Sequence, residues 1–145
     1  MGWWSATIMG GDTPLDVRDT VLFDILAIDS DEYFDDKWST EAIATKFAEK
    51  IAEVEAFDFS WADEIGDQVL GVMVMQYGLD PAIPSVAKII ERAKEAAAAD
   101  EWATDSDERR VYISDFHAAL ELYKGEPTEI AEEGLFQKMA EHLAN

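Results

Sequence analysis

Carboxylates are the most abundant reactive groups in this sequence, and they are densest in the stretch DSDEYFDD, residues 29–36. Five of these eight residues are acids, and the other three include two adjacent aromatic rings, Tyr33 and Phe34. Carboxylate oxygens ligate hard cations such as Ca²⁺, and clustered negative charge attracts basic partners. The stretch could therefore serve a metal ion or a basic protein.

The calcium interpretation fails on the spacing of the ligands. Asp29 and Asp31 suit the first and third positions of a calcium-binding loop. Phe34, however, stands where the loop needs glycine for its sharp turn, and Thr40 stands where it needs a bidentate glutamate. A second acidic group, Asp12, Asp16 and Asp19, falls at helical spacing, but such triplets arise readily among 32 acids. We therefore predict no metal site and no cofactor.

The sequence contains few residues that could act as a catalytic nucleophile or activate one. The chain has no cysteine, and its two histidines, His117 and His142, lie in predicted helices away from any serine motif. The sequence GGD at residues 10–12 is neither a P-loop nor a dinucleotide-binding fingerprint. We predict no catalytic residues and expect that the protein is not an enzyme.

The acidic stretch therefore suits a basic partner best, since carboxylates steer an encounter and aromatic rings anchor it. The alternative is that Tyr33 and Phe34 both tuck under the loop as part of the core. The predicted partner-binding residues are Asp29, Asp31, Glu32, Tyr33, Phe34, Asp35 and Asp36.

The composition narrows the possible partners. The 145 residues include 32 acids and 11 bases, and the formal net charge of −21 repels nucleic acid and anionic membranes. A hydrophobic content of 48% is too high for a disordered acidic polymer. The longest apolar run, residues 69–75, is too short to span a membrane, and no secretory signal is evident. We expect a cytoplasmic protein.

Helical spacing organises the apolar residues. Ile43, Phe47, Ile51 and Val54 recur at intervals of three and four, as on one face of a helix. Similar stripes predict further helices: one that Thr13 caps, one over 61–77 that ends at Gly78, one over 86–93, one after a cap at Asp105, and one over 130–143. Ser39 is expected to cap the helix of the first stripe, and the stretch from Asp29 to Trp38 is expected to be a loop. Trp61 and Trp102 border helices and are expected to pack. The segment VLGVMVM within 61–77 suits a central buried helix or a short strand, and the lack of a partner strand favours the helix. We predict an all-α, single compact domain of about six helices over residues 1–145.

The first residues of the chain are expected to pack against the start of the first helix. Trp3 and Trp4 precede the first helix, where large rings often fold back over the helix start, and Gly10 and Gly11 allow a tight reversal. We predict that Trp4 is structural.

The same segment carries a family resemblance. Met1, Gly2 and Trp4, followed by a glycine-containing turn and then by Asp12 and Asp16, resemble the opening of the DUF4259-like family of small bacterial and phage proteins. The similarity covers about the first 25 residues. Trp3 departs from the smaller residue that is common at its position. The resemblance implies a small intracellular helical domain and no catalytic residues.

Three functions remain open. The favoured one is an acidic interaction protein, such as a phage-type inhibitor or nucleic-acid mimic, that binds the basic surface of a nucleic-acid-binding protein and makes no direct contact with nucleic acid or membrane. The first alternative is a soluble helical protein whose acidity reflects the environment of its organism, since only seven lysines occur. The less favoured alternative is an enzyme that depends on carboxylates and a metal ion.

Overall fold

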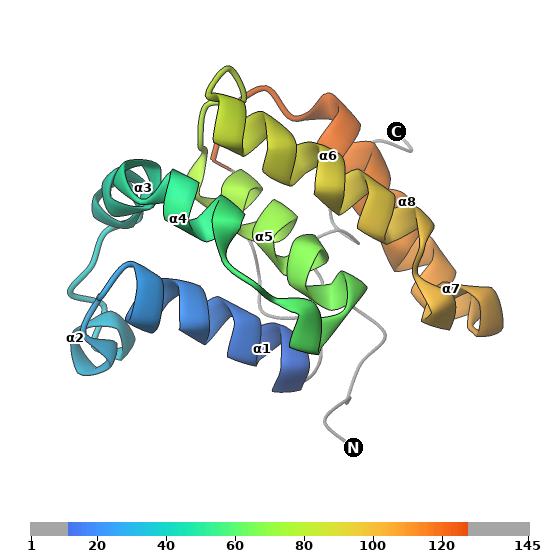
Figure 1. The fold of residues 1–145 in the computed structure, drawn as a ribbon, viewed down its shortest axis with the longest axis horizontal. Helices are drawn as coiled ribbons and strands as arrows, with labels where there is room; N and C mark the ends of the chain where they lie inside the picture. Colours follow the sequence, from blue (N-terminus) through green and yellow to red (C-terminus); the bar gives the residue numbers. More distant parts are fainter. Residues whose placement is uncertain (1–11, 128–145) are drawn as a thin grey trace.

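Every regular element of the computed structural model is a helix within residues 12–127, the part of the chain that the structure describes (Figure 1). The α-helices are α1 (Asp12–Asp19), α2 (Ser30–Phe34), α3 (Thr40–Glu49), α4 (Ile51–Ala56), α5 (Glu64–Tyr77), α6 (Pro84–Ala98), α7 (Glu101–Asp105) and α8 (Asp107–Leu122). A π-helical segment, η1 (Thr20–Ile25), continues α1, and a 3₁₀ turn, η2 (Ser60–Ala62), precedes α5. The prediction of an all-α fold is confirmed.

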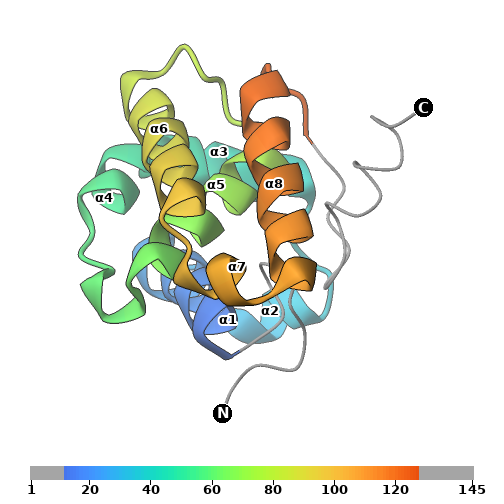
Figure 2. The same cartoon turned by 90° about the vertical axis from the view of Figure 1, so that its right-hand side faces the viewer.

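Helix α5 lies at the centre of the fold. It contacts α1, α3 and α6, and the two views show it between α1 on one side and α6 on the other (Figures 1 and 2). Residues on all of its sides are buried, from Ile65 to Tyr77, as expected for a helix that is apolar all round. The prediction that VLGVMVM forms a helix rather than a strand is confirmed.

Two glycines allow this central helix to pack closely and to end sharply. A Cβ at Gly71 would lie 2.6 Å from the Cβ of Ala93, so only glycine lets α5 approach α6 this closely. Gly78 has φ +69° and ends α5 in the left-handed conformation, and the next amide, Leu79 N–H, donates to the Val74 carbonyl at 3.1 Å. The sequence predicted that α5 ends at Gly78, and this is confirmed.

The helix caps are only partly as predicted. Ser39 caps α3 through its side chain, as expected. Thr13 lies inside α1 and does not cap it. Asp105 was predicted to cap the helix now seen as α8, which is wrong: Asp105 is the last residue of an additional helix, α7, and Ser106 caps α8. The short helix forms because Asp100 caps α7 five residues earlier.

Other differences concern short elements and one large side chain. The segment predicted as an acidic loop contains helix α2, and the second predicted helix is divided into α3 and α4 at Lys50. Trp61 was expected to pack into the core but is 54% exposed, because it lies in the turn η2 rather than on the buried face of α5. Trp102 is half-buried, in agreement with the prediction.

Several predictions fall outside the described residues. They are the family resemblance in the opening segment, the structural role of Trp4, the turn at Gly10 and Gly11, the helix over 130–143, and the position of His142.

Candidate functional site

The acidic stretch 29–36 is built around helix α2. The Asp29 carboxylate caps the helix by accepting a hydrogen bond from the Glu32 N–H at 3.0 Å. Asp35 ends the helix, and Asp36 follows it in the left-handed conformation with φ +57°. Aspartate tolerates this conformation better than most residues. A single capping residue therefore converts the expected loop into a short ordered helix.

All five carboxylates of this stretch are exposed, and none forms an ion pair within the described part of the chain. We call this region the α2 acidic surface and define it by Asp29, Asp31, Glu32, Phe34, Asp35 and Asp36. Because the carboxylates have no basic partner within residues 12–127, their charge is available to an approaching cation.

The two rings of α2 differ in how far they are buried, a difference that the sequence did not reveal. Tyr33 is half-buried against the core and meets Phe23 edge to face, with 5.6 Å between the ring centroids. Phe34 is 62% exposed, and its ring lies 5.2 Å from Tyr33 and 5.8 Å from Phe23. Phe34 is therefore an exposed ring supported by two others, whereas Tyr33 belongs to the margin of the core.

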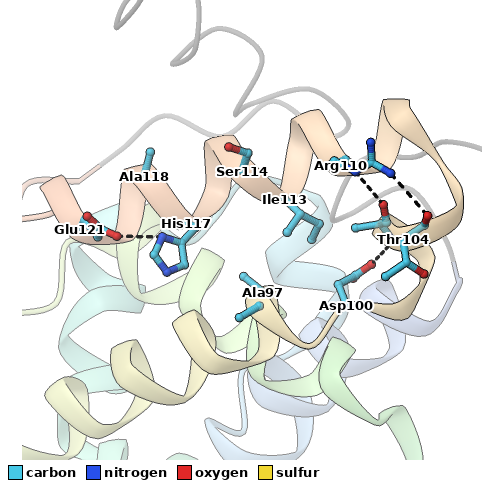
Figure 3. A pocket seen from close by; sticks show the side chains of 11 residues that line it. Ala97, Asp100, Thr104, Arg110, Ile113, Ser114, His117, Ala118 and Glu121 are labelled. Carbon is cyan, nitrogen blue, oxygen red and sulfur yellow. Dashed lines mark hydrogen bonds and ion pairs between the residues drawn. The ribbon is translucent and has the colours of Figure 1, made fainter.

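A second feature is a groove of about 700 Å³ between α6, α7 and α8 (Figure 3). Its apolar lining includes Ala97, Ala103 and Ile113, and His117 also lines it. The His117 Nδ1 lies 2.9 Å from the Glu121 carboxylate, one turn further along α8.

The polar groups of this groove do not form an activated nucleophile. Figure 3 shows the Ser114 side chain directed away from the His117 ring, so the two do not form the hydrogen-bonded pair that nucleophilic catalysis requires. Arg110 uses its guanidinium to hold Asp107 and the carbonyls of Ala103 and Thr104. The polar side chains of this groove are therefore not arranged for nucleophilic catalysis.

Sequence reasoning missed a buried polar network that joins α5, α6 and α8 to Asp100, the residue that caps α7. Arg109 of α8 is fully buried and donates to the Asp100 carboxylate at 2.8 Å and to the Gln68 side-chain oxygen at 3.0 Å. Gln68 of α5 in turn donates to Asp100 at 2.9 Å and to the Ala96 carbonyl at 3.1 Å. The guanidinium also lies 4.8 Å from the centre of the Trp102 ring.

The ionisation of Asp100 follows from these contacts. Burial alone would raise the pKa of this carboxyl, but hydrogen bonds from Arg109, Gln68 and the Ala103 N–H, together with the Arg109 charge, outweigh burial and lower it. A signal was present in the sequence: Arg109 falls on the same helical stripe as Ile113 and Phe116. The network serves the structure, because all of its members face one another in the interior.

Metal binding finds no support in the described region. Within residues 12–127, no group of three or more histidine and acidic side chains is arranged to hold an ion. Of the three acids at helical spacing along α1, Asp19 instead forms an ion pair with its neighbour Arg18 at 2.9 Å.

Comparisons with protein-family models, with curated proteins and with solved structures give no match. No helix among residues 12–127 has the length and apolar character needed to cross a membrane.

Proposed function

We propose that the protein is an acidic interaction protein that binds a basic partner protein through the α2 acidic surface. The observation that carries the proposal is the exposed ring of Phe34, which is supported by Tyr33 and Phe23 and surrounded by carboxylates without ion-pair partners in the described chain. Exposed charges accelerate the encounter, and a ring that is already fixed loses little entropy when it becomes buried in a complex.

Phe34 and the carboxylates are expected to act on different steps. The carboxylates should set the association rate, and their effect should weaken as the Debye length falls from about 10 Å at 0.1 M salt to about 3 Å at 1 M. Phe34 should set the dissociation rate, because a buried ring holds a complex after it has formed.

An NMR titration with a short arginine-rich peptide tests where such a partner binds. Backbone amide shifts should change chiefly at α2 and at the residues that support Phe34, and the changes should shrink at high salt. Shift changes spread evenly over all exposed acids would contradict the proposal, since they would show that only the net charge of −21 matters.

The finer proposal is that the α2 acidic surface competes with nucleic acid for a basic groove. Duplex DNA carries one negative charge per about 1.7 Å of its axis, so a dense row of carboxylates can occupy the same partner. The probe is labelled duplex DNA bound to the arginine-rich peptide. Adding the protein should release the DNA, and release that is unaffected by neutralising Asp31 and Asp35 to asparagine would contradict this mode.

A further inference from the structure

A second group of exposed rings lies far from α2, in the turn between α4 and α5. The odd positions of the sequence FDFSW, residues 57–61, carry Phe57, Phe59 and Trp61. Phe59 is buried, whereas Phe57 is 41% and Trp61 is 54% exposed. The Phe59 ring centre lies 4.6 Å from that of Phe57 and 6.0 Å from that of Trp61, so one buried ring supports two exposed ones.

This turn is packed firmly against α5. A Cβ at Gly66 would lie 2.7 Å from the Cβ of Phe59, so the buried ring sits directly on the first turn of the central helix. The Asp58 carboxylate accepts a hydrogen bond from the Ser60 N–H at 2.9 Å and fixes the turn from within. The two exposed rings are therefore held in place before any ligand arrives.

A small hollow of about 190 Å³ lies beside Phe57 and Phe59. It is lined by Phe57, Asp58, Phe59, Ser60, Asp63, Asp67 and Arg92. Ligand pockets for drug-sized molecules span about 300–1,000 Å³, so this hollow suits a single side chain rather than a larger molecule.

The charge balance of the hollow favours a cation. Arg92 of α6 also lines the hollow: one guanidinium N–H donates to the Glu55 carbonyl at 2.8 Å, and its buried Nε lies 3.3 Å from the Asp67 carboxylate without a hydrogen bond within residues 12–127. Arg92 is thus paired with Asp67, which leaves the other two carboxylates of the hollow uncompensated. Asp58 and Asp63 form no ion pair within residues 12–127. Hydrogen bonds from Ser60 lower the pKa of Asp58, which keeps that carboxylate charged.

We propose that this hollow receives one arginine side chain of a basic partner, with the guanidinium against the exposed ring of Phe57 and its N–H groups on the carboxylates of Asp58 and Asp63. Arginine suits the site because its planar cation stacks on aromatic faces and donates in a fork to carboxylates. The inference rests on the proposed function for the nature of the partner, but it concerns a different surface.

The test is an NMR titration of the full chain with N-acetyl-arginine amide, followed at the Trp61 indole N–H, which is assigned with a Trp61→Phe variant. We expect a saturable shift at Trp61 and at the amides of residues 57–63. N-acetyl-glutamine amide, which lacks the cation, should cause no such shift. An absent or non-saturable shift with the arginine compound would overturn the proposal.

Variants separate the contributions of rings and carboxylates. Phe57→Ala removes the exposed ring that lines the hollow and should weaken binding roughly two- to fivefold, as expected for an exposed cation–π contact. Asp58→Asn with Asp63→Asn should weaken it further, and asparagine keeps both the acceptor for the Ser60 N–H and the tolerance for the positive φ of Asp63. Unchanged binding in the double variant would contradict the assigned role of the carboxylates.

A control in the same titration distinguishes this proposal from the proposed function. Asp31→Asn with Asp35→Asn, on the α2 acidic surface, removes the same charge elsewhere and should leave the arginine shift at Trp61 unchanged. If the arginine-rich peptide perturbs α2 while the single arginine leaves Trp61 unaffected, only the hollow is disproved. The converse result would disprove the role of α2 and retain the hollow.

Discussion

Asp100 and the carboxylates of α2 place the same chemical group in opposite settings. The Asp100 side chain is 1% exposed, and Arg109, Gln68 and a backbone N–H bind it. The carboxylates of the α2 acidic surface are exposed and have no ion-pair partner in the described chain. One region uses charge to fix how α5, α7 and α8 meet, and the other leaves charge free for binding.

This difference shows why a protein with a net charge of −21 can still fold around a packed core. Exposed like charges repel one another weakly in water, whereas a buried charge requires a partner. We therefore expect substitutions in the buried network to change stability and substitutions on α2 to change binding.

The largest effect is expected from Arg109→Met, which leaves the buried Asp100 carboxylate without its cation. Removing one partner of a buried ion pair costs about 3–5 kcal/mol of the free energy of unfolding. The matched control is the next residue, Arg110→Met, where an exposed ion pair should contribute less than about 1 kcal/mol. Urea unfolding measures both, and equal losses would contradict the distinction between the two settings.

The contribution of Asp100 to the free energy of unfolding should depend on pH, which tests whether its buried charge stabilises the fold. Its folded-state pKa lies below its ordinary value of 3.8, so the stability that it contributes is present above that value and is lost as the pH falls through the folded-state pKa. The difference in free energy of unfolding between the wild type and Asp100→Asn should therefore shrink as the pH falls from about 5 to about 2. A difference that stays constant over this range would show that the charge of Asp100 is not what stabilises the network.

The two rings of α2 should respond differently to truncation. Tyr33→Ala removes a half-buried ring with two aromatic neighbours and should cost about 1–3 kcal/mol of stability. Phe34→Ala should cost less than about 1 kcal/mol, because this ring is mostly exposed. Thermal unfolding compares the two, and a larger loss for Phe34 would place that ring in the core rather than in a binding surface.

Asp115 is an intermediate case, a partly buried carboxylate of α8. Its Oδ2 is buried and has no hydrogen-bond partner among residues 12–127, and burial raises the pKa of the carboxyl. Folding therefore disfavours the ionised form relative to the unfolded chain, and Asp115→Asn should stabilise the protein at neutral pH by up to about 1 kcal/mol. The gain should disappear below the ordinary pKa of 3.8, where the unfolded chain is also protonated. Urea unfolding at pH 7 and pH 3 measures the effect, and destabilisation at pH 7 would contradict it.

The helices were predictable because their signals are local. Apolar spacing located the long helices, and Ser39 and Gly78 marked a start and an end correctly. The buried network was not predicted, because Gln68 and Arg109 lie 41 residues apart and meet only after α5 and α8 pack. The different roles of Tyr33 and Phe34 were equally hidden, since they depend on which ring of a five-residue helix packs against the core and which stays exposed.

A pair of charge-matched variants tests the central claim. The claim is that the α2 acidic surface itself binds the partner, rather than only adding to the total negative charge of the protein. Asp36 becomes asparagine rather than lysine in the first variant, because asparagine tolerates its positive φ. The α2 variant carries Asp31→Lys, Glu32→Lys, Asp35→Lys and Asp36→Asn. The control variant makes the same change of charge at exposed acids elsewhere that form no ion pair within residues 12–127, with Glu49→Lys, Glu95→Lys, Glu126→Lys and Glu101→Gln.

The most direct measurement is the affinity of both variants and the wild type for the arginine-rich peptide, by calorimetry at about 0.1 M salt. Both variants should unfold within about 0.5 kcal/mol of the wild type or be slightly more stable, because their substitutions are exposed and relieve repulsion. The α2 variant should bind about tenfold more weakly than the control variant, a difference of about 1.4 kcal/mol. Equal affinities for the two variants would contradict the claim, since binding would then follow the total charge alone.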